Sequence, residues 1–342
     1  MFVEGGNGSI RRGRGAITGI EAYQSQMYLN NPPWSEDLLH SSSSSSSASS
    51  SALPGGVVDL VKSLNKQRLY REITLALRTT LRDATAEFSF LRVKGLGKLL
   101  KFLGSVVESE NMIALFRETQ TFTKFQVVPV LFHYSIAPKS GLVPKLDDKS
   151  SEEHTKIASP PTSNEVALAL QVLEGCCLLD RDSRTLAQQH MAIKEIVRLL
   201  SAGSTLVQRA CLDALIALML DSLENQKEFE RHHGVRQVAE LVKNGNIDEE
   251  LRLKCAEFLL LVVGNVIPSS SKFIDNIEDE EGREEPSRIE SVQDDILELL
   301  GEEIASLLWA AGQLWSSIDS ERKQSSLQFQ AQQLLDCLDS KR

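Results

Sequence analysis

The sequence HMAIKEIVRLLSAG at residues 190–203 returns 42 residues later as HHGVRQVAELVKNG at residues 232–245. Ahead of the first copy, VALALQVLEGCC at 166–177 matches VQRACLDALIAL at 207–218 with a shift of 41 residues. A third match, RLKCAEFLLLVV at 252–263, follows when Cys255 is aligned with Cys211, a shift of 44 residues. Residues 164–267 therefore repeat a unit of about 42 residues.

Each unit has the apolar spacing of α-helices. One helix face collects Leu206, Ala210, Cys211, Ala214, Leu215 and Leu218. Glycine ends the following helices at residues 203 and 245. A period near 42 residues with two or three helices per unit is typical of armadillo and HEAT arrays, in which each unit covers the apolar face of its neighbour. We therefore predict an all-α, armadillo/HEAT-like helical repeat solenoid.

The same pattern divides the chain into regions. Residues 57–267 are predicted to form the armadillo-like helical repeats, interrupted at 137–163 by a surface loop with four prolines. Residues 1–56 contain an almost pure serine tract and are predicted to be disordered, because they cannot bury enough apolar surface. Residues 268–290 are predicted as an acidic linker. Helices in 291–339 are predicted to cap the open end of the array, or alternatively to form a partner-binding amphipathic segment.

The charge is concentrated in one segment. Of the net charge of −10, residues 275–303 carry −11, with thirteen acidic residues and two arginines, so the rest sums to about +1. An acidic chain without a broad basic face disfavours nucleic-acid binding. Arg92, Lys94, Lys98 and Lys101 are predicted to occupy the polar side of one amphipathic helix, which disfavours binding to lipid or microtubules. The longest apolar stretch, at 258–267, is too short to span a membrane.

The sequence contains no convincing catalytic, cofactor-binding or metal-binding constellation, and we predict that the protein is not an enzyme. His232 and His233 lack the spacing of a metal motif and fit a polar turn. Four of the five cysteines lie in apolar helical runs without CxxC spacing, which indicates buried thiols in a reducing compartment: Cys176, Cys177, Cys211 and Cys255. A cytoplasmic location is expected, and a nuclear one stays open.

The candidate partner-binding positions follow from the repeat alignment. In armadillo arrays a ladder of Trp and Asn on the groove-lining helix grips an extended peptide. The equivalent positions here hold Asp213 and Ala217, then Glu257 and Leu261. Karyopherin- or catenin-like peptide binding is therefore disfavoured. The carboxylates indicate either a groove for a basic or polar helix or ordinary solvated positions, and the predicted partner-binding residues are Arg209, Asp213, Arg252, Lys254 and Glu257.

Two strings resemble a specific family. The pattern ACLD…DSxEN…F occupies residues 210–213 and 221–229, and RLKCxEFL occupies residues 252–259. Over about residues 57–267 the chain resembles the cell-division-control protein of the septation initiation network, which is distinct from the phosphatase that shares its name. The resemblance implies an armadillo-like, non-catalytic partner that binds and localises a STE20-type kinase in septation and cytokinesis, at the spindle pole or the division site. The alternative is an armadillo interaction scaffold unrelated to division.

Overall fold

The computed structural model describes residues 55–137, 159–274, 294–315 and 320–340, and within these ranges the chain is helical, without strands. The predicted all-α class is confirmed. The chain forms two compact units, residues 1–65 and 66–342. Nearly all of the predicted disordered tail lies outside the described residues, as do most of the 137–163 loop and most of the acidic linker.

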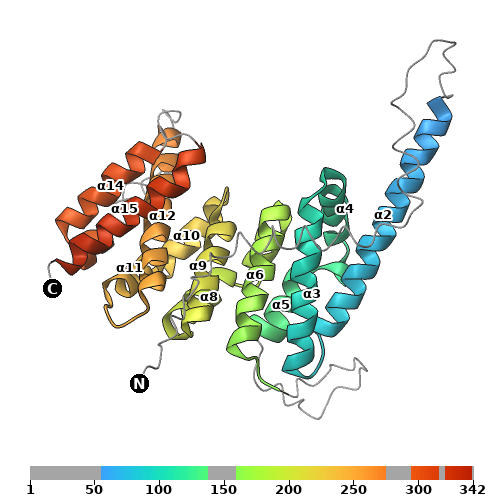
Figure 1. Cartoon of the computed structure of the whole chain (residues 1–342), viewed down its shortest axis with the longest axis horizontal. Helices are drawn as coiled ribbons and strands as arrows, with labels where there is room; N and C mark the ends of the chain where they lie inside the picture. The colour runs from blue at the N-terminus through green and yellow to red at the C-terminus, as the bar shows by residue number, and fades with distance from the viewer. Residues whose placement is uncertain (1–54, 138–158, 275–293, 316–319, 341–342) are drawn as a thin grey trace, which may run out of the picture. The chain divides into compact units, whose positions relative to one another are not determined.

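From α6 to α12 the helices follow one another with short connections (Figure 1). None of the helices in the described ranges is long and apolar enough to cross a membrane. The elements are α2 (Gly55–Ala84), α3 (Ser89–Val107), α4 (Glu110–Gln120), the 3₁₀ turn η2 (Thr123–Phe125), α5 (Val128–Leu131), the π-helical turn η3 (Phe132–Ile136), α6 (Ser163–Leu179), α7 (Arg181–Gln189), α8 (Ala192–Ala202), α9 (Thr205–Met219), α10 (Leu223–Arg231), α11 (Gly234–Lys243), α12 (Glu249–Ile274), α14 (Glu302–Trp315) and α15 (Ser320–Asp339).

Four long helices form the core of the second unit. Helix α3 packs against α6, α6 against α9, and α9 against α12. Their contact faces are apolar, and Leu99, Leu173, Leu215 and Leu259 are fully buried, one from each helix. Because α6 packs against α9 and α9 against α12, the residues on the outer faces of these three helices lie on neighbouring helices.

A run of three helices occurs twice with the same local geometry. In α7–α8–α9 and again in α10–α11–α12, two short helices precede a long one. Asp180 and Ser222, 42 residues apart, cap the first short helix of each run with a side-chain oxygen. Met191 and His233, also 42 residues apart, both take the left-handed conformation with φ of 54° directly before the second helix. The backbone thus repeats with the spacing seen in the sequence.

Side-chain contacts repeat as well. In α9, Gln208 Nε2 donates to the carbonyl oxygen of Leu200 at 2.9 Å. In α12, Arg252 Nε donates to the carbonyl oxygen of Val242 at 3.0 Å. Residues 208 and 252 are separated by 44 positions, the same shift that aligns Cys211 with Cys255. At equivalent positions, α9 and α12 therefore each donate a side-chain hydrogen bond to a carbonyl group near the end of the preceding helix.

The C-terminal helices lie against α12. Both α14 and α15 pack on it, and α12 itself continues to Ile274, seven residues beyond the predicted end of the repeats at 267. The two helices contribute buried apolar side chains, among them Ile304, Leu308, Leu334 and Leu335. The far side of α12 is therefore shielded from water by the chain itself.

The prediction for Arg92 was wrong. Its side chain is fully buried and forms an ion pair with the buried Glu165 of α6, with Nε 2.7 Å from Oε1 and Nη2 3.1 Å from Oε2. The remaining donors reach the carbonyl oxygens of Ala86, Glu87 and Ser159 at 2.8 to 3.1 Å. Helical periodicity alone assigned Arg92 to the polar face, whereas a partner 73 positions away allows the charge to be buried.

Candidate partner-binding surface

Three neighbouring long helices present a cluster of charged side chains, which we call the carboxylate cluster: Glu174 of α6, Asp213 of α9, and Lys254 and Glu257 of α12. Asp213 and Glu257 occupy equivalent positions in the aligned repeats. Lys254 Nζ lies 2.7 Å from Asp213 Oδ2, and each of these two side chains is about one third exposed. The cluster is therefore partly desolvated but open to an approaching molecule.

The electrostatics of the cluster are unbalanced, since three carboxyl groups share one ammonium group. Burial raises the pKa of Glu174 to about 7, with a further upward contribution from Asp213 and an opposing one from Lys254. Burial also raises the pKa of Glu257, while Lys254 lowers it. A cation supplied from outside would relieve this repulsion, because it would favour the ionised form of both glutamates.

Of the five predicted residues, the structure brings Asp213, Lys254 and Glu257 together. Arg209 lies one helical turn before Asp213, where its guanidinium pairs with Asp248 and Glu250 at the start of α12. Arg252 is elsewhere: its side chain is 8% exposed and forms two hydrogen bonds with the carboxylate of Asp339 in α15, at 2.8 and 3.1 Å. Arg252 thus joins α12 to the C-terminal helix.

Glu174 is the member that the sequence prediction missed. The repeat alignment sets it against Leu215 and Leu259, which are both fully buried. A carboxyl group at a position that is apolar in the other copies is unusual for a helix core. A glutamate where the other two copies have leucine is therefore the feature of the sequence that could have identified Glu174.

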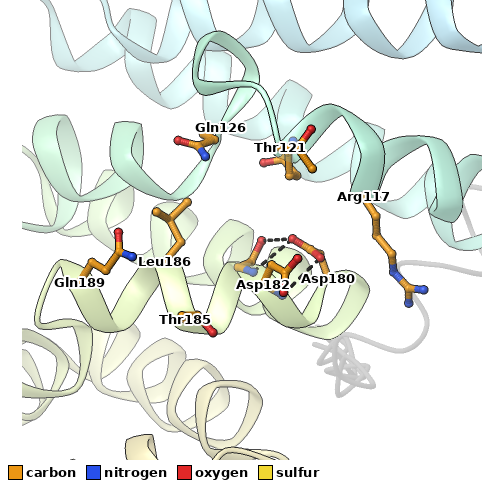
Figure 2. A pocket seen from close by; sticks show the side chains of 10 residues that line it. Arg117, Thr121, Gln126, Asp180, Asp182, Thr185, Leu186 and Gln189 are labelled. Carbon is orange, nitrogen blue, oxygen red and sulfur yellow. Dashed lines mark hydrogen bonds between the residues drawn. The ribbon is translucent and has the colours of Figure 1, made fainter.

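A polar cavity of about 240 Å³ lies between α4 and η2 on one side and α7 on the other (Figure 2). The Asp180 carboxylate on its wall accepts hydrogen bonds from the backbone of Asp182 and Ser183 and from the Ser183 hydroxyl, and so caps α7. The lining holds no histidine, cysteine or lysine; it consists of Arg117, Gln120, Thr121, Gln126, Asp180, Asp182, Ser183, Thr185, Leu186 and Gln189. These groups can form hydrogen bonds with a polar molecule in the cavity.

The described cysteines are free thiols rather than disulfides. Burial raises the pKa of Cys177, Cys211 and Cys255 to about 12, which keeps these thiols protonated and poorly nucleophilic at neutral pH. Within the described residues, no group of His, Cys, Asp and Glu side chains could hold a metal ion.

The family model for Cell division control protein 14, SIN component, matches residues 108–296, more than half of the chain. The chain belongs to this family. The predicted resemblance to the septation initiation network (SIN) component is confirmed, and SIN-component membership indicates a role in cell-division signalling, distinct from that of the phosphatase of the same name. The match extends to residue 296, into the acidic segment at 275–303 that the two quoted strings do not reach.

Two crystal structures of engineered proteins are similar to this SIN component. One has 16% sequence identity and a TM-score of 0.42, and the similarity covers 77% of this chain and 98% of the engineered one. The other has 14% identity and a TM-score of 0.40, covering 77% and 96%. Similarity at this level carries no argument about function. No curated protein is significantly similar to the chain.

Proposed function

We propose that this SIN component is a non-enzymatic adaptor that binds a STE20-type protein kinase and localises it during septation and cytokinesis. Family membership over residues 108–296 is the observation that carries the proposal. A protein with this role acts through a surface rather than through a catalytic centre. The partly exposed carboxylate cluster on α6, α9 and α12 is the surface that we propose for this role.

We further propose that the helical body is an armadillo-type solenoid. The support comes from the recurrence of three helices with equivalent caps and equivalent left-handed residues 42 positions apart. The repeated contacts of Gln208 and Arg252 add to it. In such an array the long third helices line one continuous face, and this arrangement suits the binding of an extended helix or peptide.

The chemistry of the surface favours a partner with basic side chains. Lys254 neutralises only part of the charge of Asp213, Glu174 and Glu257. An arginine or lysine from the kinase would add the missing positive charge in a partly desolvated site, where ion pairs are stronger than in water. The interaction is expected to weaken as ionic strength rises.

The test is affinity purification of the tagged full-length chain from dividing cells, beside the variant Asp213→Arg/Glu257→Arg. We expect a STE20-type kinase with the wild type and its loss, by on the order of tenfold or more, with the variant. The matched control is Glu108→Arg/Glu240→Arg, which reverses two exposed carboxylates on α3's C-cap and α11. It should retain the kinase.

The remaining outcomes separate the alternatives. A folded charge-reversal variant that still recovers the kinase would reject the carboxylate cluster as the binding surface. Recovery of other proteins without any kinase, from wild type and variant alike, would reject the kinase role and favour a general interaction scaffold. Imaging in the same cells tests localisation: we expect signal at the spindle pole or division site, and a uniformly nuclear signal would contradict this.

A further inference from the structure

Helix α2 ends and α3 begins at a tight corner of the chain (Figure 1). Two aromatic side chains at this corner are exposed. The Phe88 and Phe90 residues are 48% and 69% exposed. Their rings stack on each other with centroids 6.0 Å apart and an interplanar angle of 29°. Neither ring belongs to the buried core, so together they expose slightly more apolar surface than one whole phenyl group.

The local fold does not require these rings. Phe88 is the N-cap residue of α3, a position that favours Ser, Thr, Asp or Asn, and it makes no side-chain capping bond. The first amide of the helix is instead satisfied from elsewhere, because Ser89 N–H donates to Ser159 Oγ at 2.6 Å. A polar residue at 88 would serve the helix at least as well. The phenyl groups therefore need an explanation outside the folding of the chain.

Cations surround the same corner. The end of α2 lies directly against α3, since a Cβ added at Gly95 would be 2.5 Å from the backbone nitrogen of Ala84. Arg78 and Arg82 are exposed on the last turns of α2, and Lys94 and Lys98 are exposed on the first turns of α3. Against these four cations stand two carboxylates: Asp83, which pairs with Lys98 at 2.8 Å and with Arg82, and the exposed Glu87.

The sequence alone disfavoured lipid binding by Lys94 and Lys98, but the structure adds Arg78, Arg82 and two exposed rings to the same corner. We propose that this corner, defined by Phe88, Phe90, Arg78, Arg82, Lys94 and Lys98, docks on the surface of a membrane that contains anionic lipid. The two rings would enter the interfacial layer, and the cations would lie over phosphate and carboxylate headgroups. A membrane fits better than an acidic peptide because rings that are half to two-thirds exposed lack the walls of a peptide groove. This inference is independent of kinase binding.

The test is co-sedimentation of the full-length chain with vesicles of phosphatidylcholine containing about one third phosphatidylserine. We expect binding to these vesicles, little binding to pure phosphatidylcholine, and weakening by salt. The variant Phe88→Ala/Phe90→Ala should bind at least about tenfold more weakly, because two apolar anchors are removed. Arg82→Glu/Lys94→Glu should lose on the order of tenfold or more, because two attractive charges become repulsive.

Matched controls are available on other helices. Phe329→Ala removes a 63% exposed phenyl group from α15, and Lys243→Glu reverses an exposed lysine of α11; both should bind vesicles like the wild type. Circular dichroism should show all variants folded. Absent binding to phosphatidylserine vesicles, or wild-type binding by the Phe88/Phe90 variant, would overturn the proposal. Unchanged vesicle binding with loss of a protein partner in that variant would assign the corner to protein recognition instead.

Discussion

Two ion pairs join neighbouring long helices of this SIN component, and they differ in almost every physical respect. Arg92–Glu165 links α3 to α6 and is fully buried, and Ser89 and Ser135 also donate hydroxyl hydrogen bonds to the Glu165 carboxylate. Asp213–Lys254 links α9 to α12 and is one third exposed beside extra carboxyl groups. The first pair has every hydrogen-bonding group satisfied and holds the fold. The second retains unbalanced charge and belongs to the surface that we propose for a partner.

The largest expected effect comes from breaking the buried pair. Arg92→Met removes five hydrogen bonds and leaves Glu165 as an uncompensated buried carboxylate. We expect the free energy of unfolding to fall by about 3–5 kcal/mol. Chemical denaturation followed by circular dichroism measures it.

The double variant Arg92→Met/Glu165→Met sharpens that result. Removing both charges should recover part of the lost stability, because a well-packed apolar pair can replace a buried ion pair. Ser89 and Ser135 would still lose their acceptor, so recovery should be incomplete. A single variant as stable as the wild type would show that the buried pair does not support the α3–α6 junction.

The sequence predicted the two regions unequally. Repeated apolar spacing predicted the helices and aligned Asp213 with Glu257, because both signals are local in the chain or recur at a fixed shift. The Arg92–Glu165 pair could not be predicted, since it joins residues 73 positions apart in the chain. Arg252 was predicted to face a partner, but its contact with Asp339 depends on how α15 folds back onto α12. Periodicity gives the buried face of a helix, not which distant element covers it.

The carboxylate cluster should respond to pH through its partly buried member Glu174. Its pKa rises from 4.5 to about 7 in the folded state, so the folded chain binds the proton more tightly than the unfolded chain. Stability is therefore expected to fall as pH rises from about 4.5 to about 7, and the full penalty applies above that. Glu174→Gln, which mimics the protonated form, should stabilise the protein by about 3 kcal/mol at pH of about 8 and change little near pH 4.5.

Melting curves at the two pH values test this expectation. Glu240→Gln, at an exposed position of α11, is the control and should leave the pH dependence unchanged. An equal shift of the melting temperature at both pH values would mean that the Glu174 carboxyl does not titrate in this range.

Arg252 is an intermediate case between the two ion pairs, because its own side chain is 8% exposed while that of Asp339 is 47% exposed. Arg252→Met loses the bond to Val242 and both bonds to Asp339 but keeps apolar contact. We expect a loss of about 1–2 kcal/mol, since Asp339 can regain water. Gln208→Met, at the equivalent position in α9, provides the comparison by chemical denaturation. If Gln208→Met lost more stability than Arg252→Met, the bonds of Arg252 to Asp339 would contribute less than expected.

The smallest effect on stability is expected at the exposed pair. Lys254→Met removes the 2.7 Å contact with Asp213, but both groups are one third exposed, so stability should change by less than about 1 kcal/mol.

The same substitution should strengthen the binding of a basic partner, although it slightly weakens the fold. Without Lys254, the cluster of Glu174, Asp213 and Glu257 becomes more negative, and a basic partner should bind several-fold more tightly at low salt. Titration of the recovered kinase against wild type and variant, at low and high ionic strength, measures the affinity and its salt dependence. Weaker binding at low salt would mean that Lys254 itself contacts the partner, and the surface would then recognise an acidic rather than a basic group.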